Sequence, residues 1–299
     1  MGATTTGGKP RDPREAEAKP PYPRQQQRSP GHETEMSPRP DYGRDSYKGH
    51  GRLQDRKALI TGGDSGIGRA VALAFAREGA DVAIVYRSSD ADAEETVEAV
   101  RESGRKAVKV RADLSLDEEC ARAVQEIATE LGRLDIVVNN AAVQGTAVKR
   151  FEELSAARVE ETFRTNIVAM FNVVRHALPH MKAGASVINV GSIQAYQPSA
   201  EILDYAATKG AIVTFTKGLS ESLLERGIRV NCVAPGPVWT PLVVQSFPAE
   251  KNESFGKDSP MGRPAQPVEL APAFVFLASD EARYVSGEVL GVTGGKPLA

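Results

Sequence analysis

The sequence feature that most constrains the fold is a short apolar run followed directly by a glycine-rich turn and a helical pattern. The run is Lys57-Ala58-Leu59-Ile60-Thr61, and the turn is Gly62-Gly63-Asp64-Ser65-Gly66-Ile67-Gly68. Apolar residues at helical spacing continue from Ala70 to Phe75, so we expect a buried strand, a tight turn and a helix in that order. In this position glycines let backbone amides approach a pyrophosphate, whose charge the helix N-terminus favours. The succession predicts a dinucleotide-binding loop, whereas such glycines by themselves also occur in ordinary turns.

The same alternation of strand and helix repeats along the chain. Further strands are predicted at 81–86, 106–111, 134–138, 185–190, 228–234 and 288–292. Helices are predicted at 91–103, 116–131, 155–182 with an interruption at Pro179, a segment carrying Tyr205 that ends near Arg226, and 267–279. Strands that alternate with helices are joined by right-handed crossovers into a parallel sheet. We therefore expect an α/β fold: a single-domain, doubly wound Rossmann fold with about seven parallel strands and helices on both faces.

Candidate binding motifs fall where predicted strands end. They are the glycine loop, Arg87, Asp113, the turn Asn139-Asn140-Ala141-Ala142, and Ser192. Ligands of open parallel sheets bind beyond the carboxyl ends of the strands. The coincidence of these motifs at one edge therefore predicts one ligand cleft.

The residues after the second strand bear on the choice between two nicotinamide cofactors. The strand ends in Tyr86-Arg87, and no acid that could accept from ribose hydroxyls follows before Asp90. An arginine here suits a 2′-phosphate, which favours NADP(H) over NAD(H). Against this, the carboxylate of Asp64 in the glycine loop repels a phosphate, and Arg87 is equally well explained as a solvated side chain.

A catalytic pattern follows the strand predicted at 185–190. Ser192 comes at the end of that strand, and Tyr205 and Lys209 lie four residues apart on the next helix, hence on one face. A free phenol titrates at about 10, and a nearby ammonium favours the phenolate and lowers that pKa. Tyr205 can then exchange a proton with a substrate oxygen held by Ser192. The same spacing is also found on amphipathic helices without a catalytic role.

Two other segments have a structural and a functional interpretation. Asn166 lies on an otherwise apolar helical face, where a buried amide needs partners; it either serves helix packing or anchors a water that relays protons. The turn at 235–241, bounded by prolines, suits contact with a planar ring. Residues 241–263 mix aromatic with charged groups and are expected to form an irregular, mobile lid over a pocket.

The first 52 residues differ in kind from the rest. They contain eight prolines and no Val, Leu, Ile, Phe or Trp, so they cannot bury enough apolar surface to fold alone. Met36, Tyr42 and Tyr47 can nevertheless anchor an extended chain on a globular surface or on a neighbouring subunit. We expect an extension over residues 1–52, disordered at first and packed as an arm from about residue 35, followed by an NAD(P)-binding catalytic domain over 53–299.

Charge, cysteines and hydropathy exclude several classes of partner. The formal net charge of −2 gives no reason to expect a nucleic-acid or membrane-surface partner, and no apolar run approaches the length of a membrane span. Cys120 and Cys232 lack metal-ligand spacing, and the pair His176 and His180 has no acidic partner motif. We expect no metal site and a reduced, cytoplasmic protein.

As an ordered set, these residues resemble the short-chain dehydrogenase/reductase family, in its shorter single-domain branch, over roughly residues 53–299. The matching motifs are TGxxxGxG from Thr61 to Gly68, Asn139 to Ala142, Asn166, Ser192 with Tyr205-x-x-x-Lys209, Arg229-Val230-Asn231 before Pro235-Gly236, and Gly287 to Gly295. The family's Asn-Asn-Ala-Gly turn ends here in Ala142. The extension, with Glu35-Met36-Ser37-Pro38-Arg39-Pro40, is similar to that of a bacterial subgroup related to aldehyde reductases and plant glucose and ribitol dehydrogenase homologues.

The resemblance implies a role for each residue of the site. Tyr205 would be the general acid/base, Lys209 would lower its pKa and bind the nicotinamide ribose, Ser192 would position the carbonyl or carbinol oxygen, and Asn166 would hold a relay water. Cofactor contacts are implied for Gly62, Asp64, Ser65, Gly66, Ile67, Gly68, Tyr86, Arg87, Ser88, Asp113, Leu114, Asn140, Ala141, Ala142, Pro235, Gly236, Val238 and Thr240, besides Tyr205 and Lys209. NADP(H) is favoured, NAD(H) is the alternative, and a homotetramer is implied.

Two classes of function fit this pattern. The first is an NAD(P)-dependent oxidoreductase that interconverts an aldehyde, ketone or sugar with an alcohol; the second is a dinucleotide-sensing or scaffold protein without turnover. Proteins of the second class usually lose the Tyr or the Lys, and both are present here, so we expect an enzyme. The substrate is not predicted, because pocket shape depends on how residues 194–203 and 241–263 fold.

Overall fold

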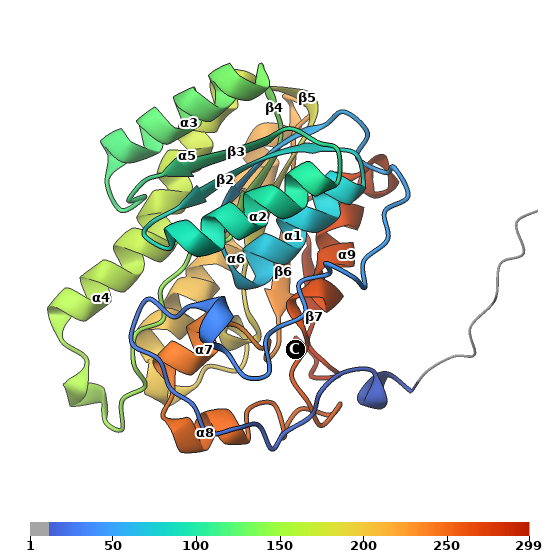
Figure 1. Ribbon diagram of the computed structural model, residues 1–299. Coiled ribbons are helices and arrows are strands. Elements are labelled where there is room, and N and C mark those ends of the chain that lie inside the picture. Colours follow the sequence, from blue (N-terminus) through green and yellow to red (C-terminus); the bar gives the residue numbers. More distant parts are fainter. Residues whose placement is uncertain (1–11, 299) are drawn as a thin grey trace, which may run out of the picture.

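A parallel sheet of seven strands lies at the centre of the computed structural model, which describes residues 12–298 (Figure 1). The strands are β1 (Lys57–Thr61), β2 (Asp81–Tyr86), β3 (Ala107–Arg111), β4 (Leu134–Asn139), β5 (Met181–Val190), β6 (Arg229–Pro235) and β7 (Val289–Val292). Their order is β3-β2-β1-β4-β5-β6-β7, and every neighbouring pair is parallel. The chain moves outward from β1 to β3 and resumes at β4 in the opposite direction. The predicted doubly wound sheet is confirmed, and its switch point lies between β1 and β4.

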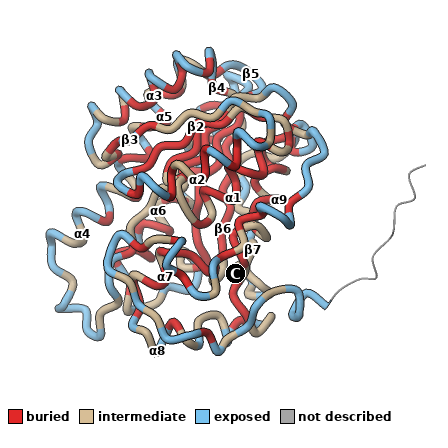
Figure 2. The backbone as a smooth tube through the Cα atoms, viewed as in Figure 1, coloured by how far each residue is buried: buried red, intermediate tan, exposed pale blue. Residues whose placement is uncertain are grey.

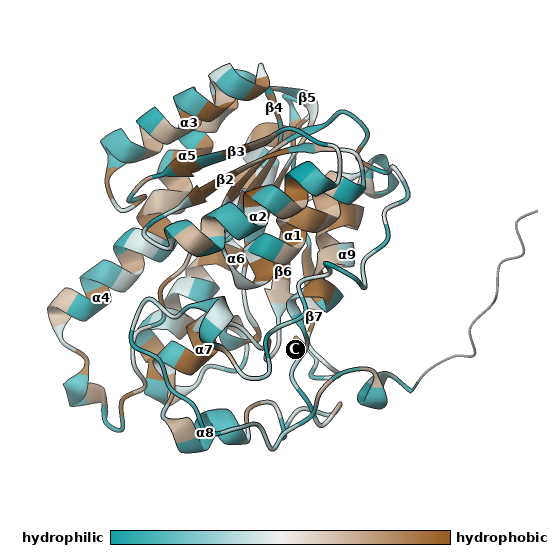
Figure 3. Cartoon of the chain, viewed as in Figure 1, coloured by the Kyte–Doolittle hydropathy of each residue, from teal (hydrophilic) through white to brown (hydrophobic). Residues whose placement is uncertain are grey.

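Helices cover both faces because alternate residues of each strand supply two hydrophobic cores. In β1, Ala58 and Ile60 pack in the core shared with α1 (Gly66–Arg77), α2 (Asp90–Glu102) and α9 (Pro267–Ala278). Leu59 points into the opposite core, shared with α3 (Asp117–Leu131), α5 (Ala169–Ala177) and α6 (Leu203–Leu224). Figure 2 shows the strands buried between helices with exposed outer surfaces, and Figure 3 shows the matching apolar strands and polar outer helix faces.

The remaining elements are short. They are α4 (Ala156–Phe163), α7 (Pro241–Ser246), α8 (Ala249–Glu253), the π-helical turn η4 (Arg164–Val168), and the 3₁₀ turns η1 (Pro13–Glu15), η2 (Glu33–Glu35), η3 (Phe151–Glu153), η5 (Leu178–His180), η6 (Ile193–Ala195), η7 (Ala200–Ile202) and η8 (Asp280–Ala282). Nowhere between residues 12 and 298 is a helix both long and apolar enough to cross a membrane.

The structure corrects the expected secondary structure at two places. Residues 241–263 are not wholly irregular, because they contain α7 and α8. Pro241 is the first residue of α7 and Pro248 directly precedes α8, so both prolines begin helices instead of interrupting them. The fifth strand begins at Met181 and not at Ala185, since the exposed stretch Lys182–Gly184 hides its start from hydropathy.

The N-terminal arm, defined here as residues 12–52, runs along the surface of the same chain. It passes α8 and α7 and then reaches the outer sides of α1 and α2 (Figure 1). Tyr22 is already buried, against Trp239, so packing begins well before the expected residue 35. Residues 1–11, the first part of the expected loose stretch, lie outside the described residues.

Candidate active site

The glycine loop after β1 is held tightly against the turn after β4. Gly62 and Gly66 adopt the left-handed φ angles of +61° and +53°. A Cβ on Gly68 would lie 2.1 Å from the carbonyl oxygen of Gly62, so a side chain there would displace the loop. Asn140 Nδ2 donates to the carbonyl oxygens of Thr61 and Gly62 at 3.0 and 2.8 Å. The two strand ends beside the switch point therefore form one rigid floor.

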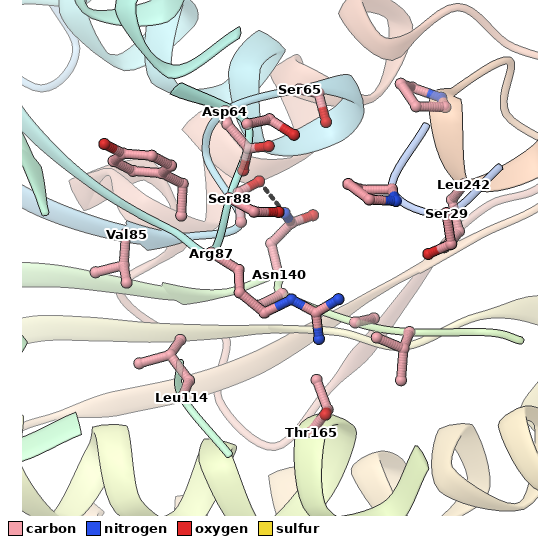
Figure 4. A pocket seen from close by; sticks show the side chains of 18 of the residues that line it. Ser29, Asp64, Ser65, Val85, Arg87, Ser88, Leu114, Asn140, Thr165 and Leu242 are labelled. Atoms are coloured by element: carbon pink, nitrogen blue, oxygen red, sulfur yellow. Dashed lines mark hydrogen bonds between the residues drawn. The ribbon is translucent and has the colours of Figure 1, made fainter. Parts of the chain in front are cut away.

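A first cavity of about 210 Å³ opens above this floor (Figure 4). Eleven of the predicted cofactor residues line it: Gly62, Asp64, Ser65, Tyr86, Arg87, Ser88, Asp113, Leu114, Asn140, Ala141 and Ala142. Figure 4 shows Arg87 reaching toward the middle, with Asp64 and Ser65 on one side and Leu114 and Thr165 on the other. Ser29, Pro30 and Gly31 of the N-terminal arm also line this cavity, and no motif in the sequence had indicated them.

The acids of the first cavity differ in their environments. Burial raises the pKa of Asp64 to about 6. The pKa of Asp113 is lowered, because hydrogen bonds from Ser115 and the charge of Arg87 outweigh the effect of its partial burial. Asp90, the next acid after β2, is not among the residues that line this cavity, and its carboxylate accepts from the Tyr86 hydroxyl at 2.7 Å. Arg87 directly follows the end of β2 and supplies a basic side chain to this cavity.

A second cavity of about 300 Å³ adjoins the first and shares Asn140, Ala142 and Leu242 with it. Its lining includes the predicted residues Ile67, Ser192, Tyr205, Lys209, Pro235, Gly236, Val238 and Thr240. Ser192 lies at the end of β5 and accepts from the Gln194 amide at 3.1 Å, whereas Tyr205 and Lys209 come from the start of α6. Lys209 Nζ donates to the carbonyl oxygen of Val190 at 2.8 Å and lies 5.1 Å from the ring centre of Tyr205. The structure thus brings the expected hydroxyl, phenol and ammonium together.

Burial dominates the electrostatics of this group. It raises the pKa of Tyr205 to about 12, and a hydrogen bond with Ser192 offsets only part of that rise. Burial also lowers the pKa of Lys209 to about 8. In the chain by itself the net shift of the phenol's pKa is therefore upward, and the lowering of that pKa by Lys209 stays a prediction. Its ammonium is engaged by the Val190 carbonyl, and the loss of hydration of the phenolate is the larger effect.

Asn166 lies in the π-helical turn and borders neither of the two large cavities. Its Oδ1 accepts from the Val143 amide at 2.8 Å, and its Nδ2 donates to Val143 O at 2.9 Å and Thr208 Oγ1 at 3.1 Å. The side chain therefore holds the loop after β4 against α6. The role of Asn166 in anchoring a relay water stays a prediction.

Asp204, next to Tyr205, fixes the beginning of α6. Its buried carboxylate accepts from Arg158 Nε and Nη2 at 2.9 and 3.0 Å and from Thr162 Oγ1 at 2.9 Å. Arg158 also donates to the Thr146 carbonyl at 2.5 Å. This bidentate pair ties α4 and the loop after β4 to the turn that carries the phenol.

Several residues of the second cavity had not been predicted. Gln144 and Lys296 line it without any earlier indication, and the segments 194–203 and 241–263, which were expected to shape a pocket, supply Gln194, Gln197, Phe247, Phe255, Asp258 and Ser259. Gln144 follows the Asn-Asn-Ala-Ala turn by two residues, and its buried Nε2 has no hydrogen-bond partner in the described part of the chain. For Gln144 the only signal in the sequence was its position after that turn. The other residues meet at the cavity because loops distant in the sequence fold against one another.

The two cavities together fit a dinucleotide. A cleft in two halves joined at Leu242 matches a molecule of two nucleotides, with Arg87 in one half and Tyr205 in the other. The closely packed loop of Gly62, Gly66 and Gly68 lies at the start of α1, where the helix N-terminus favours a phosphate. No group of metal-ligating side chains occurs within residues 12–298.

Comparisons with known proteins place this geometry in context. A family model described as enoyl-(acyl carrier protein) reductase matches residues 62–296. The chain is 48% identical over 279 residues to glucose and ribitol dehydrogenase of Daucus carota, covering 91% of this chain and 96% of the relative. It is 47% identical over 277 residues to the chloroplastic NADPH-dependent aldehyde reductase 1 of Arabidopsis thaliana, a match that covers 90% of this chain and 96% of that relative. A crystal structure of a short chain dehydrogenase from Burkholderia cenocepacia in complex with NADP is similar, with a TM-score of 0.76 and 32% sequence identity. The match covers 82% of this chain and 98% of that one.

Proposed function

Because the chain belongs to the short-chain dehydrogenase/reductase family, we propose that it interconverts a carbonyl compound and an alcohol with NADP(H) as hydride carrier. The observation that carries the proposal is the convergence of Ser192, Tyr205 and Lys209 on one cavity that continues into another able to hold the rest of a dinucleotide. When bound, the nicotinamide supplies or accepts the hydride. The protein positions the substrate oxygen and moves the proton.

In the reducing direction Tyr205 donates a proton to the substrate oxygen, which Ser192 holds by hydrogen bonding. A phenol with a pKa of about 12 is protonated at neutral pH and therefore ready to donate. In the oxidising direction the phenolate is needed. Lys209, with a pKa of about 8, is still mostly charged at neutral pH and favours that form, as does the positive charge of an oxidised nicotinamide.

NADP(H) is the proposed cofactor, with NAD(H) as the alternative. Arg87 in the first cavity supports this choice, as do the names of the Arabidopsis relative and the Burkholderia complex. The carboxylate of Asp64 opposes a 2′-phosphate less as the pH falls toward its pKa of about 6. We expect Arg87→Ala to weaken NADPH binding about 10- to 100-fold and NADH binding little, because a charge-assisted hydrogen bond is lost. An equal loss for both cofactors would remove the argument for a 2′-phosphate site.

The proposal is tested by following NADPH and NADH oxidation with a panel of aldehydes, ketones and sugars. Tyr205→Phe should lower kcat about 10²- to 10⁴-fold and leave cofactor affinity nearly unchanged, since it removes the proton donor alone. Tyr284→Phe, at a fully exposed tyrosine, is the matched control and should behave as wild type. Tight cofactor binding without turnover on any substrate would favour the sensing or scaffold function.

Four further points belong to the proposal. Residues 53–299 are the catalytic domain, the protein is a homotetramer, and it works in the cytoplasm on a small carbonyl or alcohol. Asn166 anchors the water that relays protons away from Lys209. Light scattering of the purified chain tests the tetramer, and a monomer at micromolar concentration would contradict it.

A further inference from the structure

The N-terminal arm takes part in the wall of the first cavity. Ser29, Pro30 and Gly31 line the cavity together with Arg87 and Leu242. Figure 4 places Ser29 beside Leu242, on the side away from Val85. A segment that sequence analysis assigned to an extension outside the catalytic domain thus borders the space proposed for the ADP half of the cofactor.

This part of the arm is seated on α7. The Gln27 amide donates to the Val244 carbonyl at 3.0 Å, and the Gly31 amide donates to Gln245 Oε1 at 2.6 Å. The Gln27 side chain closes a short loop of the arm. Its Oε1 accepts from the His32 amide at 2.6 Å, and its Nε2 donates to the His32 carbonyl at 3.0 Å. These contacts fix the arm against the helix whose Leu242 borders both cavities.

A buried carboxylate links the same stretch to the glycine loop. Glu33 is fully buried, and its two oxygens accept from the Gly66 amide at 2.7 Å and from Arg69 Nη1 at 2.9 Å. A charge-assisted bond to the N-terminus of α1 is favourable, and its removal would leave the buried guanidinium with fewer partners. The arm therefore connects α7 on one side of the cavity with the glycine loop on the other.

The arm also packs against Trp239, which lies between Val238 and Thr240 of the second cavity. Tyr22 stacks on Trp239 with ring centres 4.4 Å apart, its amide donates to the Glu253 carbonyl at 2.9 Å, and Trp239 Nε1 donates to the Pro38 carbonyl at 2.8 Å. Trp239 is the single tryptophan of the chain and is fully buried. Its fluorescence therefore reports directly whether the arm is docked.

We propose that the N-terminal arm is a built-in part of the cofactor site: residues 29–31 contact the ADP half of NADP(H), and the arm holds α7 over it. This inference rests on the proposed function, because it presumes a dinucleotide in the two cavities. The arm then contributes to cofactor affinity, with little effect on the chemical step at Tyr205. Residues on the arm that face solvent have no such effect.

The direct test is a substitution that places a larger side chain on the side of the cavity formed by the arm. Ser29 is exposed and lines the cavity, so Ser29→Phe changes the space for the cofactor without disturbing a packed core. We expect this variant to bind NADPH and adenosine 2′,5′-bisphosphate at least about tenfold more weakly than wild type does. Gln26→Phe, at an exposed arm residue outside both cavities, is the matched control and should bind both probes as wild type does.

A second pair of variants tests the seating of the arm. A Cβ on Gly31 would lie 2.9 Å from the Pro241 carbonyl oxygen, so Gly31→Val wedges the arm away from α7. We expect weaker binding of both probes, a red-shifted Trp239 emission and faster acrylamide quenching. Glu33→Gln should act in the same direction, whereas Glu35→Gln, two residues away and exposed, should not.

The possible results separate the two proposals. Unchanged affinity for both probes in Ser29→Phe, or in a Gly31→Val chain whose Trp239 emission has shifted, would overturn the role of the arm and leave the dehydrogenase intact. Equal weakening by Gln26→Phe would overturn it too. A wild-type chain that binds no dinucleotide would overturn the proposed function and the role of the arm together.

Discussion

Lys209 gives the most quantitative prediction, because its burial links the pH dependence of stability to the site. Burial lowers the pKa of its ammonium from the ordinary 10.5 to about 8. Between these two values the unfolded chain keeps the proton that the folded chain has lost, so the free energy of unfolding rises with pH. At about 1.4 kcal/mol per pKa unit, the lowering of the Lys209 pKa corresponds to about 3 kcal/mol of the free energy of unfolding. Below pH 8 the burial penalty is fully present, and it is relieved as the pH approaches 10.5.

Lys209→Met removes this titration and keeps a side chain of similar length. We expect the stability of wild type relative to the variant to increase by about 3 kcal/mol between pH 7 and pH 11, with most of the rise above pH 8. The lost hydrogen bond to the Val190 carbonyl shifts the difference by a constant and leaves its pH trend unchanged. At pH 7 the variant is spared the burial of a charge, yet it is catalytically impaired.

The assay is urea unfolding of the cofactor-free chain, followed by Trp239 fluorescence at one-unit pH steps. Titrations common to both proteins cancel in the difference, so the trend isolates Lys209. Lys217→Met, at an exposed lysine on the same helix, is the matched control and should follow wild type at every pH. Parallel curves for wild type and Lys209→Met would refute the reasoning, because they would mean that the buried ammonium keeps its ordinary pKa.

Three other substitutions have expected outcomes. Arg69→Met should lower the free energy of unfolding by about 3–5 kcal/mol in urea titrations, since Glu33 would be left as a buried, poorly paired carboxylate; a loss below 1 kcal/mol would contradict this. Gly68→Ala should weaken NADPH binding at least about tenfold in fluorescence titrations, because the new Cβ would meet a loop carbonyl 2.1 Å away, and wild-type affinity would speak against a tight loop. Asp204→Asn should lower kcat more than it changes cofactor affinity, as the start of α6 loses its bidentate arginine partner; the reverse pattern would assign the pair to cofactor binding.

Much of the fold could be predicted because each strand is a short apolar run that ends in glycine or a polar residue. Leu59-Ile60 before Gly62 and Val137-Val138 before Asn140 show both the strand and its carboxyl end. In a parallel sheet these ends meet at one edge, so motif positions in sequence translate into proximity in space. The meeting of Ser192 with Tyr205 needed no further information, since one follows a strand and the other begins the next long helix.

The parts that could not be predicted depend on partners far along the chain. The helices α7 and α8 within residues 241–263 were not predicted, because a proline at the start of a short helix looks the same in sequence as a proline that ends one. The pKa of Tyr205 was expected to fall because helical spacing places Lys209 beside it. Spacing alone does not contain the degree of burial or the Val190 carbonyl that engages the ammonium.

The N-terminal arm shows where composition misleads most. A segment without Val, Leu, Ile, Phe or Trp cannot build a core, and from that we expected loose chain up to about residue 35. Ordering requires only that the segment complete a core supplied by others, and Tyr22, Met36 and Tyr42 do so by packing against residues of the domain. An arm ordered in this way has no stability of its own. Its docking is therefore coupled to the state of α7 and the glycine loop, and any ligand that contacts these elements and the arm together must stabilise all three.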